Sequence, residues 1–182
     1  MKSINELEKF PAGMSLLADD LIEFHAARLL LLIGICGINS RIDGLTKLAK
    51  LDFFVRYPHF FDKACSVSGE DIKSASNLVE SSMIRHHYGP WDHRYYQILA
   101  FLRSRGLIQI TKDQKTYRFN LTPLGKQKVK SLEKEQCYKQ MCEQMRRVKK
   151  AFGNKAGSAL KNSIYKIFQE EVTRKLLGEI IE

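Results

Sequence analysis

The order of apolar and polar positions predicts a helical first half of the chain. Residues 29–36 are apolar on every side of a helix, and Asp19 and Asp20 ahead of them favour a helix start. A helix without a polar face is surrounded by protein, so we predict a central core helix over about 20–37. Apolar residues at three- and four-residue spacing predict a second helix over 45–57, closed by Pro58, with these basic residues outward: Lys47, Lys50 and Arg56.

Two further helices are predicted downstream. Residues 71–86 place apolar side chains at helical spacing, and Gly89-Pro90 then forces a turn. The next helix covers about 92–104, with Asp92 as its cap and Gly106 as its end.

A β-hairpin follows, because the period changes to two. Residues 107–111 and 116–121 alternate apolar and polar side chains, which predicts two strands joined by the loop 112–115. Thr122 and Pro123 are suited to the N-cap and first position of another helix.

Helices followed by a basic-tipped hairpin and a further helix are the order of a winged helix, in which the helix before the hairpin is the potential recognition helix. Residues 59–91 separate the second and third elements of that motif, where a DNA-reading helix-turn-helix has a short turn. We therefore expect a mainly α fold with a small antiparallel β-hairpin. Its winged-helix core covers residues 1–130, with an inserted helical segment at about 59–91.

The last third of the chain predicts a basic C-terminal helical hairpin over 131–182. Residues 126–152 and 158–181 form two helical segments, each with one apolar stripe, separated by a glycine-containing break. Either the stripes pack on the protein's own core, or part of them docks on a partner helix, where methionines adapt well.

The excess of positive charge is confined to the second half. The 182 residues carry a net charge of +10, yet residues 1–91 contain 10 basic and 11 acidic residues, whereas residues 92–182 contain 20 and 9. Such asymmetry favours a polyanion contact in the second half, although basic residues can simply solvate helix faces. The 44% hydrophobic content excludes wholesale disorder.

No apolar run is long enough to span a bilayer or suitably placed for a signal peptide, so we expect a cytoplasmic protein without membrane contact. Four cysteines without zinc spacing are expected to be reduced thiols.

Catalytic signatures are missing from the sequence. It contains no GxGxxG, GxxxxGK[ST], GxSxG or HExxH motif. His86-His87 with Asp92 and His93 has metal-ligand residue types at a spacing unlike established zinc sites, and a packed turn is the simpler interpretation. His25 on the core helix is expected to be a hydrogen-bonded structural residue. We therefore expect no metal, no cofactor and no enzymatic activity.

The predicted fold selects two groups of DNA-contact candidates. The tyrosines, Tyr95 and Tyr96 among them, are expected to pack in the core. The third helix and the hairpin contribute six DNA-contact candidates: Arg94, Gln97, Arg103, Lys112, Lys115 and Arg118. The C-terminal segments contribute the second group, whose contacts would be electrostatic and independent of DNA sequence: Arg146, Arg147, Lys149, Lys150, Lys155 and Lys161.

Three segments resemble a known family. Residues 45–58, 83–106 and 116–125 look like the small middle component of bacterial ABC-three-component systems, the Lamassu anti-phage and anti-plasmid group. The most distinctive stretch is His86-His87-Tyr88-Gly89-Pro90-Trp91-Asp92, similar to an RYGPWD-like motif with His87 before the tyrosine. The resemblance covers about residues 20–130.

This resemblance implies a non-catalytic accessory subunit that works beside an SMC-like coiled-coil ATPase and a nuclease-like effector. Such a subunit bridges its partners and can contact double-stranded DNA nonspecifically. The alternative hypothesis is a free-standing winged-helix transcription regulator that dimerises through its C-terminal helices, and a small nuclease is the weakest. A fold alone does not choose between a DNA reader and a protein-interaction module.

Overall fold

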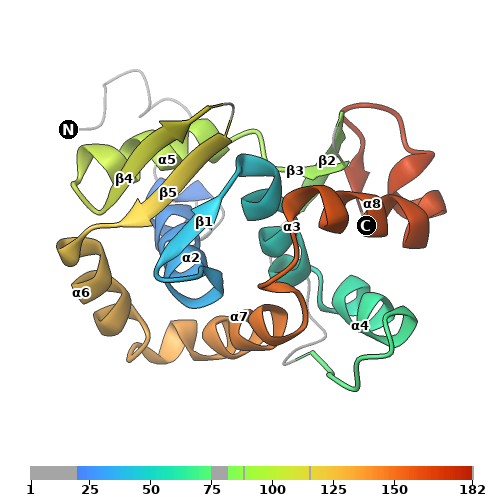
Figure 1. The fold of residues 1–182 in the computed structure, drawn as a ribbon, viewed down its shortest axis with the longest axis horizontal. Helices are drawn as coiled ribbons and strands as arrows, with labels where there is room; N and C mark the ends of the chain where they lie inside the picture. The colour runs from blue at the N-terminus through green and yellow to red at the C-terminus, as the bar shows by residue number, and fades with distance from the viewer. Residues whose placement is uncertain (1–19, 75–81, 88, 115, 182) are drawn as a thin grey trace, which may run out of the picture.

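The computed structural model describes residues 20–74, 82–87, 89–114 and 116–181 (Figure 1). It confirms a mainly α protein with small antiparallel sheets, two of three strands each within the described residues. The elements in chain order are α2 Ile22–Cys36, β1 Arg41–Asp43, α3 Leu45–Arg56, α4 Pro58–Val67, β2 Met83–His86, β3 Gly89–Trp91, α5 Tyr95–Ser104, β4 Ile108–Asp113, β5 Thr116–Leu121, α6 Pro123–Leu132, the 3-10 turn η2 Gln136–Tyr138, α7 Lys139–Phe152, α8 Gly157–Ile167, the π-helical turn η3 Gln169–Thr173 and β6 Ile180–Ile181.

Helix α2 is the centre of the core, as its uniformly apolar second half predicts. Leu29, Leu31 and Ile33 are fully buried. Helices α3, α5, α6 and α7 all pack against α2, so it is enclosed on several sides (Figure 1).

The predicted hairpin is formed by β4 and β5, and β1 joins it in the strand order β1-β5-β4. Phe119 of β5 lies opposite Ile42 on one side and Ile110 on the other. The hairpin is longer than expected, because Lys112 and Asp113 belong to β4 rather than to a loop. Lys115 lies outside the described residues.

The predicted helix over 71–86 is wrong for the part that the structure describes. Residues 71–74 have no helical structure, residues 75–81 lie outside the described part, and Met83–His86 is strand β2. This strand pairs with β3 and with β6 near the end of the chain. Tyr57 secures the arrangement, since its hydroxyl accepts from the Met83 N–H at 2.6 Å and donates to the Ile181 carbonyl at 2.8 Å.

Helix boundaries on either side of this sheet also differ from the prediction. Pro58 starts α4 instead of only ending α3, which is a favourable position because the first helical turn needs no N–H there. Trp91 lies in β3, so α5 begins three residues after Asp92 rather than at it.

The C-terminal helices are shorter than predicted. Residues 126–152 are divided into α6, η2 and α7, and the segment 158–181 is helical only as far as α8 and η3. Their apolar stripes pack on the protein's own core: α7 lies against α2 and α3, and α8 lies against α3. The stripe ends at Val172, because Leu176 is 72% exposed. No helix in the described part of the chain is long and apolar enough to cross a membrane.

Candidate nucleic-acid interface

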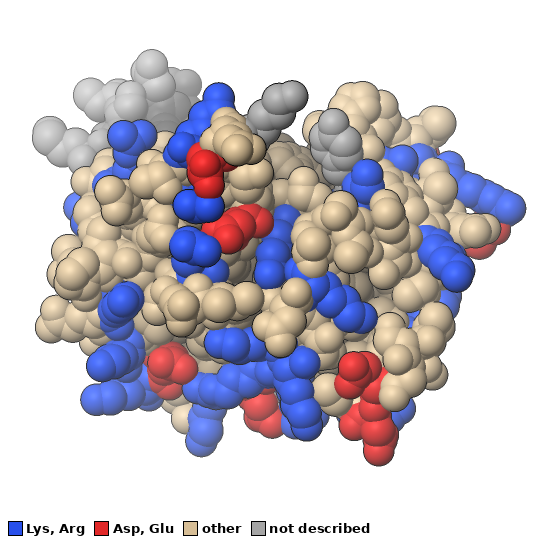
Figure 2. All heavy atoms as spheres, viewed as in Figure 1, with Lys and Arg blue, Asp and Glu red and all other residues tan. Residues whose placement is uncertain are grey.

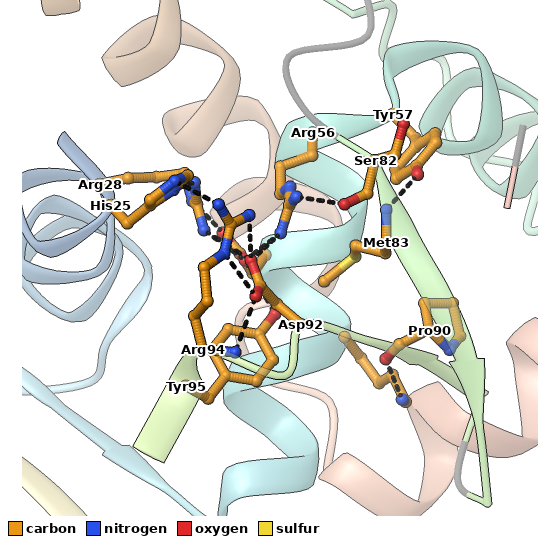
Figure 3. A network of polar contacts seen from close by, with 12 residues as sticks. His25, Arg28, Arg56, Tyr57, Ser82, Met83, Pro90, Asp92, Arg94 and Tyr95 are labelled. Atoms are coloured by element: carbon orange, nitrogen blue, oxygen red, sulfur yellow. Dashed lines mark hydrogen bonds and ion pairs between the residues drawn. The ribbon is translucent and has the colours of Figure 1, made fainter. Parts of the chain in front are cut away.

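A buried polar network fixes where α5 starts (Figure 3). Asp92 is its centre: its Oδ2 accepts from Arg56 Nη1 at 2.8 Å and from Arg94 Nη2 at 3.0 Å. Its Oδ1 accepts from the Arg94 backbone N–H and from Arg94 Nε, both at 2.9 Å. The carboxylate therefore caps the turn before α5 and ties it to α3.

The same network continues into α2. Arg28 Nε donates to Asp52 Oδ1 at 3.0 Å, and the Tyr95 hydroxyl donates to Asp52 Oδ2 at 2.8 Å. His25 lies between two guanidiniums, with its Nδ1 2.6 Å from Arg28 and its Nε2 2.6 Å from Arg94. His25 is thus the hydrogen-bonded structural residue that its sequence position predicts.

The outward orientation predicted for the basic residues of α3 is wrong for two of them. Arg56 and Lys50 are fully buried, whereas Lys47 is half-buried and donates to the Gly153 carbonyl at 2.7 Å. Arg56 is retained in the interior because Asp92 and Asp52 neutralise it. Lys50 instead donates to the Pro90 carbonyl at 2.9 Å, which links α3 to β3.

Burial and neighbouring charge shift two pKa values in this region. Burial raises the pKa of Asp92, but hydrogen bonds from Arg94 and the charge of Arg56 lower it further, so the net pKa lies well below the ordinary value. Burial lowers the pKa of Lys50 to about 7, and the charges of Arg85 and Lys161 act in the same direction.

A cavity of about 1130 Å³ lies between α5 and the β4–β5 hairpin. We call it the aromatic groove. Its walls include four large aromatic rings, and Arg103 and His86 add a guanidinium and an imidazole. The ring-bearing and apolar residues are Leu45, Trp91, Tyr96, Leu99, Ala100, Ile110, Tyr117 and Phe119.

The candidates on α5 and the hairpin differ in how free they are. Arg94 is committed to Asp92 and His25, which leaves it unsuited to DNA contact. Gln97 and Arg103 are exposed on α5, and Lys112 lies 5.8 Å from the centre of the Tyr117 ring. Arg118 pairs with Asp113 at the surface.

Several candidates of the second group are also engaged within the protein. Arg146 pairs with Glu133 at 2.8 Å and Arg147 with Glu143 at 2.6 Å. Arg147 and Lys149 further hold the chain together, since they donate to backbone carbonyls of Lys73 and Gly37 respectively.

The other three members of that group are dispersed. Lys150 is exposed on α7, and Lys155 follows α7 with its ammonium 4.9 Å from the centre of the Phe152 ring. Lys161 is half-buried on α8, near Lys50. Four of the six residues therefore lie on α7, one lies in the segment after it and one lies on α8.

Helix α6 presents a basic surface whose lysines were not among the DNA-contact candidates predicted from the sequence. Its three lysines are exposed, and α6 has no acidic residue in its first turn: Lys126, Lys128 and Lys130. The signal was the absence of any Asp or Glu between residues 123 and 132. Figure 2 shows blue side chains along the lower edge of the molecule, over α6 and α7. We call the exposed cations of these helices and their connection the α6–α7 basic face: Lys126, Lys128, Lys130, Lys134, Lys139, Arg146, Lys149 and Lys150.

Within the described ranges, no group of three His, Cys, Asp or Glu side chains could hold a metal ion. In the histidine cluster considered from the sequence, Asp92 accepts hydrogen bonds from arginines, and the His86 ring stacks on Trp91 with ring centres 5.3 Å apart.

Comparison of the chain with protein-family models, with curated proteins and with solved structures found no match.

Proposed function

We propose that this protein is a non-catalytic accessory subunit with a winged-helix core, which contacts double-stranded DNA through electrostatic interactions. In this proposal it works in an SMC-like ATPase and effector complex of anti-phage and anti-plasmid defence, where it bridges the other subunits. The ATPase and effector rest on the sequence resemblance, whereas the DNA contact also has support from the arrangement of charge.

The order of elements supports a winged-helix core. Helix α2, strand β1, helix α3, helix α5 and the β4–β5 hairpin follow one another with strand order β1-β5-β4, and α5 packs next to the hairpin. In this interpretation α5 is the recognition helix and β4–β5 the wing. Helix α4 and strands β2 and β3 are the insertion between α3 and α5.

The observation that carries the proposal is the α6–α7 basic face. Lys126, Lys130 and Lys150 are exposed and have no ion-pair partner among the described residues. Unpaired surface lysines repel one another, and a line of phosphates relieves that repulsion while releasing condensed counterions. The contact requires no base readout, so affinity for DNA should not depend on its sequence.

A charge-reversal comparison tests the DNA contact. Lys126, Lys130 and Lys150 are replaced together by Glu, and binding to a fluorescent duplex of about 20 bp is measured at about 50 mM salt. The control replaces three exposed cations elsewhere with Glu: Lys73, Lys166 and Arg174. Arg147 and Lys149 are left intact because their backbone hydrogen bonds would confound folding.

We expect the α6–α7 variant to bind duplex DNA about tenfold or more weakly than the wild type, with the control variant much less affected. Equal weakening of both variants would contradict an interface on α6 and α7. Co-elution with a coiled-coil ATPase supports the subunit role. A stable homodimer that prefers one palindromic sequence would instead support the alternative, a free-standing transcription regulator.

A further inference from the structure

Two of the aromatic side chains that line the aromatic groove are exposed to solvent. Tyr96 on α5 is 68% exposed and Tyr117 on β5 is 49% exposed. Tyr95, its neighbour, is fully buried, so the expectation that both tyrosines pack in the core is correct for Tyr95 and wrong for Tyr96. Each of these rings therefore keeps solvent-accessible surface for stacking, although Lys112 lies over the Tyr117 ring and Tyr96 contacts Trp91.

The walls behind these rings are apolar and already packed. Trp91 is held between His86, with ring centres 5.3 Å apart, and Tyr95, with ring centres 5.1 Å apart in an edge-to-face contact. Tyr96 leans on the same indole at 6.0 Å. The cavity of about 1130 Å³ exceeds the roughly 300–1000 Å³ of typical small-ligand sites, so it has room for a planar ring system.

The charges at the groove favour an anionic occupant. No Asp or Glu is among the described residues that line the groove. Arg103 lines it and has no ion-pair partner in the described part of the chain. Lys112 lies beside Tyr117 at the hairpin end of the same wall. A purely apolar protein segment would leave this guanidinium without a counter-charge.

Polar side chains also line the groove. His86 Nδ1 is buried and has no hydrogen-bond partner among the described residues, and Thr46 and Thr116 are further polar residues of the lining. A ligand with a polar ring edge can use such groups, because unpaired polar atoms are costly to leave buried.

We propose that the aromatic groove takes an unpaired nucleotide of a nucleic acid strand. The base stacks on Tyr96 and Tyr117, and a flanking phosphate pairs with Arg103. This inference rests on the proposed DNA contact and deepens it, since the groove would recognise a single-stranded end or gap beside a duplex held elsewhere. A paired base shows its faces only to its neighbours in the stack, whereas an unpaired base presents both faces and can enter between two rings.

The only tryptophan of the chain provides the readout, because Trp91 lines the groove. Its emission is followed while the intact protein is titrated with three probes: a blunt duplex of about 20 bp, the same duplex with an overhang of about four thymidines, and a single strand of about eight thymidines. The variants Tyr96→Leu and Arg103→Gln remove one stacking face and the phosphate partner. Their matched controls are Gln109→Ala and Arg105→Gln, which change exposed residues near the groove that do not line it.

We expect the overhang and the single strand, but not the blunt duplex, to change Trp91 emission. Tyr96→Leu should weaken binding of the overhang duplex about tenfold relative to the blunt one, as is typical for loss of one stacked base. The controls should behave as wild type.

Binding of both duplexes with equal affinity and unchanged Trp91 emission would overturn the nucleotide site while leaving the proposed DNA contact in place. If the single strand changes the Trp91 emission while the blunt duplex fails to bind, the result supports the nucleotide site in the groove and contradicts the proposed contact with duplex DNA.

Discussion

Replacement of Asp92 by Asn is the sharpest test of how the structure positions α5. The substitution preserves the size of the side chain but removes the negative charge between Arg56 and Arg94. Both oxygens of Asp92 are fully buried and receive hydrogen bonds of 2.8–3.0 Å from these residues. In the variant, one of the two oxygens becomes an NH₂ group that faces guanidinium donors.

The expected cost follows from this geometry. Breaking a buried ion pair by neutralising one partner typically destabilises a protein by about 3–5 kcal/mol, because the other charge stays buried without compensation. For a chain of this length, each kcal/mol lowers the melting temperature by about 2–4 °C. Asp92→Asn should therefore melt roughly 6–20 °C below the wild type.

The assay is thermal unfolding followed by circular dichroism at neutral pH. Asp113→Asn is the matched control, since it removes a carboxylate that pairs with Arg118 at half-exposed positions, where an ion pair contributes less than about 1 kcal/mol. A melting temperature of Asp92→Asn within about 2 °C of the control would show that Asp92 is not needed to keep the Arg56 charge in the interior.

Three further predictions concern other parts of the chain. Burial lowers the pKa of Lys50 to about 7, so above that pH the unfolded chain binds more protons than the folded one. The free energy of unfolding, measured by denaturant titration, should therefore rise from pH 7 towards pH 10 by up to about 1.4 kcal/mol per pH unit. A Lys50→Met variant should lack this rise. Cys137 is the exposed thiol, whereas burial raises the pKa of Cys36 to about 12, so a thiol reagent should label one cysteine quickly in the native protein and four in denaturant. Gly125→Ala should lower stability by about 1–3 kcal/mol in chemical unfolding, because the added Cβ would lie 2.0 Å from the Leu107 carbonyl oxygen; an unchanged midpoint would contradict this close approach.

Elements whose signals are local in sequence were predicted well. Helix α2 follows from its apolar run, and the β4–β5 hairpin follows from the alternation that ends at Leu121. Thr122 caps α6 as predicted, with its hydroxyl accepting from the Gly125 N–H at 3.0 Å. In each of these cases short-range periodicity and end signals agree with the tertiary structure.

The failures have a common physical cause, because distant pairing decided them. Met83 and Ile84 fit a helical pattern, yet they form a strand whose partners, Ile181 and Ile180, come from the other end of the chain. Local propensity carries no information about that pairing. The π-helical turn that interrupts the last helix beyond Phe168 lacks a glycine or proline signal as well.

The candidate interface was predictable in charge but not in detail. The sequence shows that residues 92–182 carry the positive excess, but it gives no reason to separate Arg94, which pairs with Asp92, from Arg103, which lines the groove. Exposure of Tyr96 beside buried Tyr95 depends on where α5 meets the hairpin. Such distinctions require the ion-pair network of α2 and α3, whose members are far apart in sequence.

The most direct test of the central claim is the salt dependence of duplex DNA binding by the intact wild-type protein. We expect the logarithm of the association constant to fall linearly with the logarithm of salt concentration, with a slope of about −3 or steeper, since three or more lysines on α6 and α7 replace counterions. Binding should be similar for duplexes of unrelated sequence. No measurable binding at about 50 mM salt, or affinity that does not change up to about 200 mM, would contradict it.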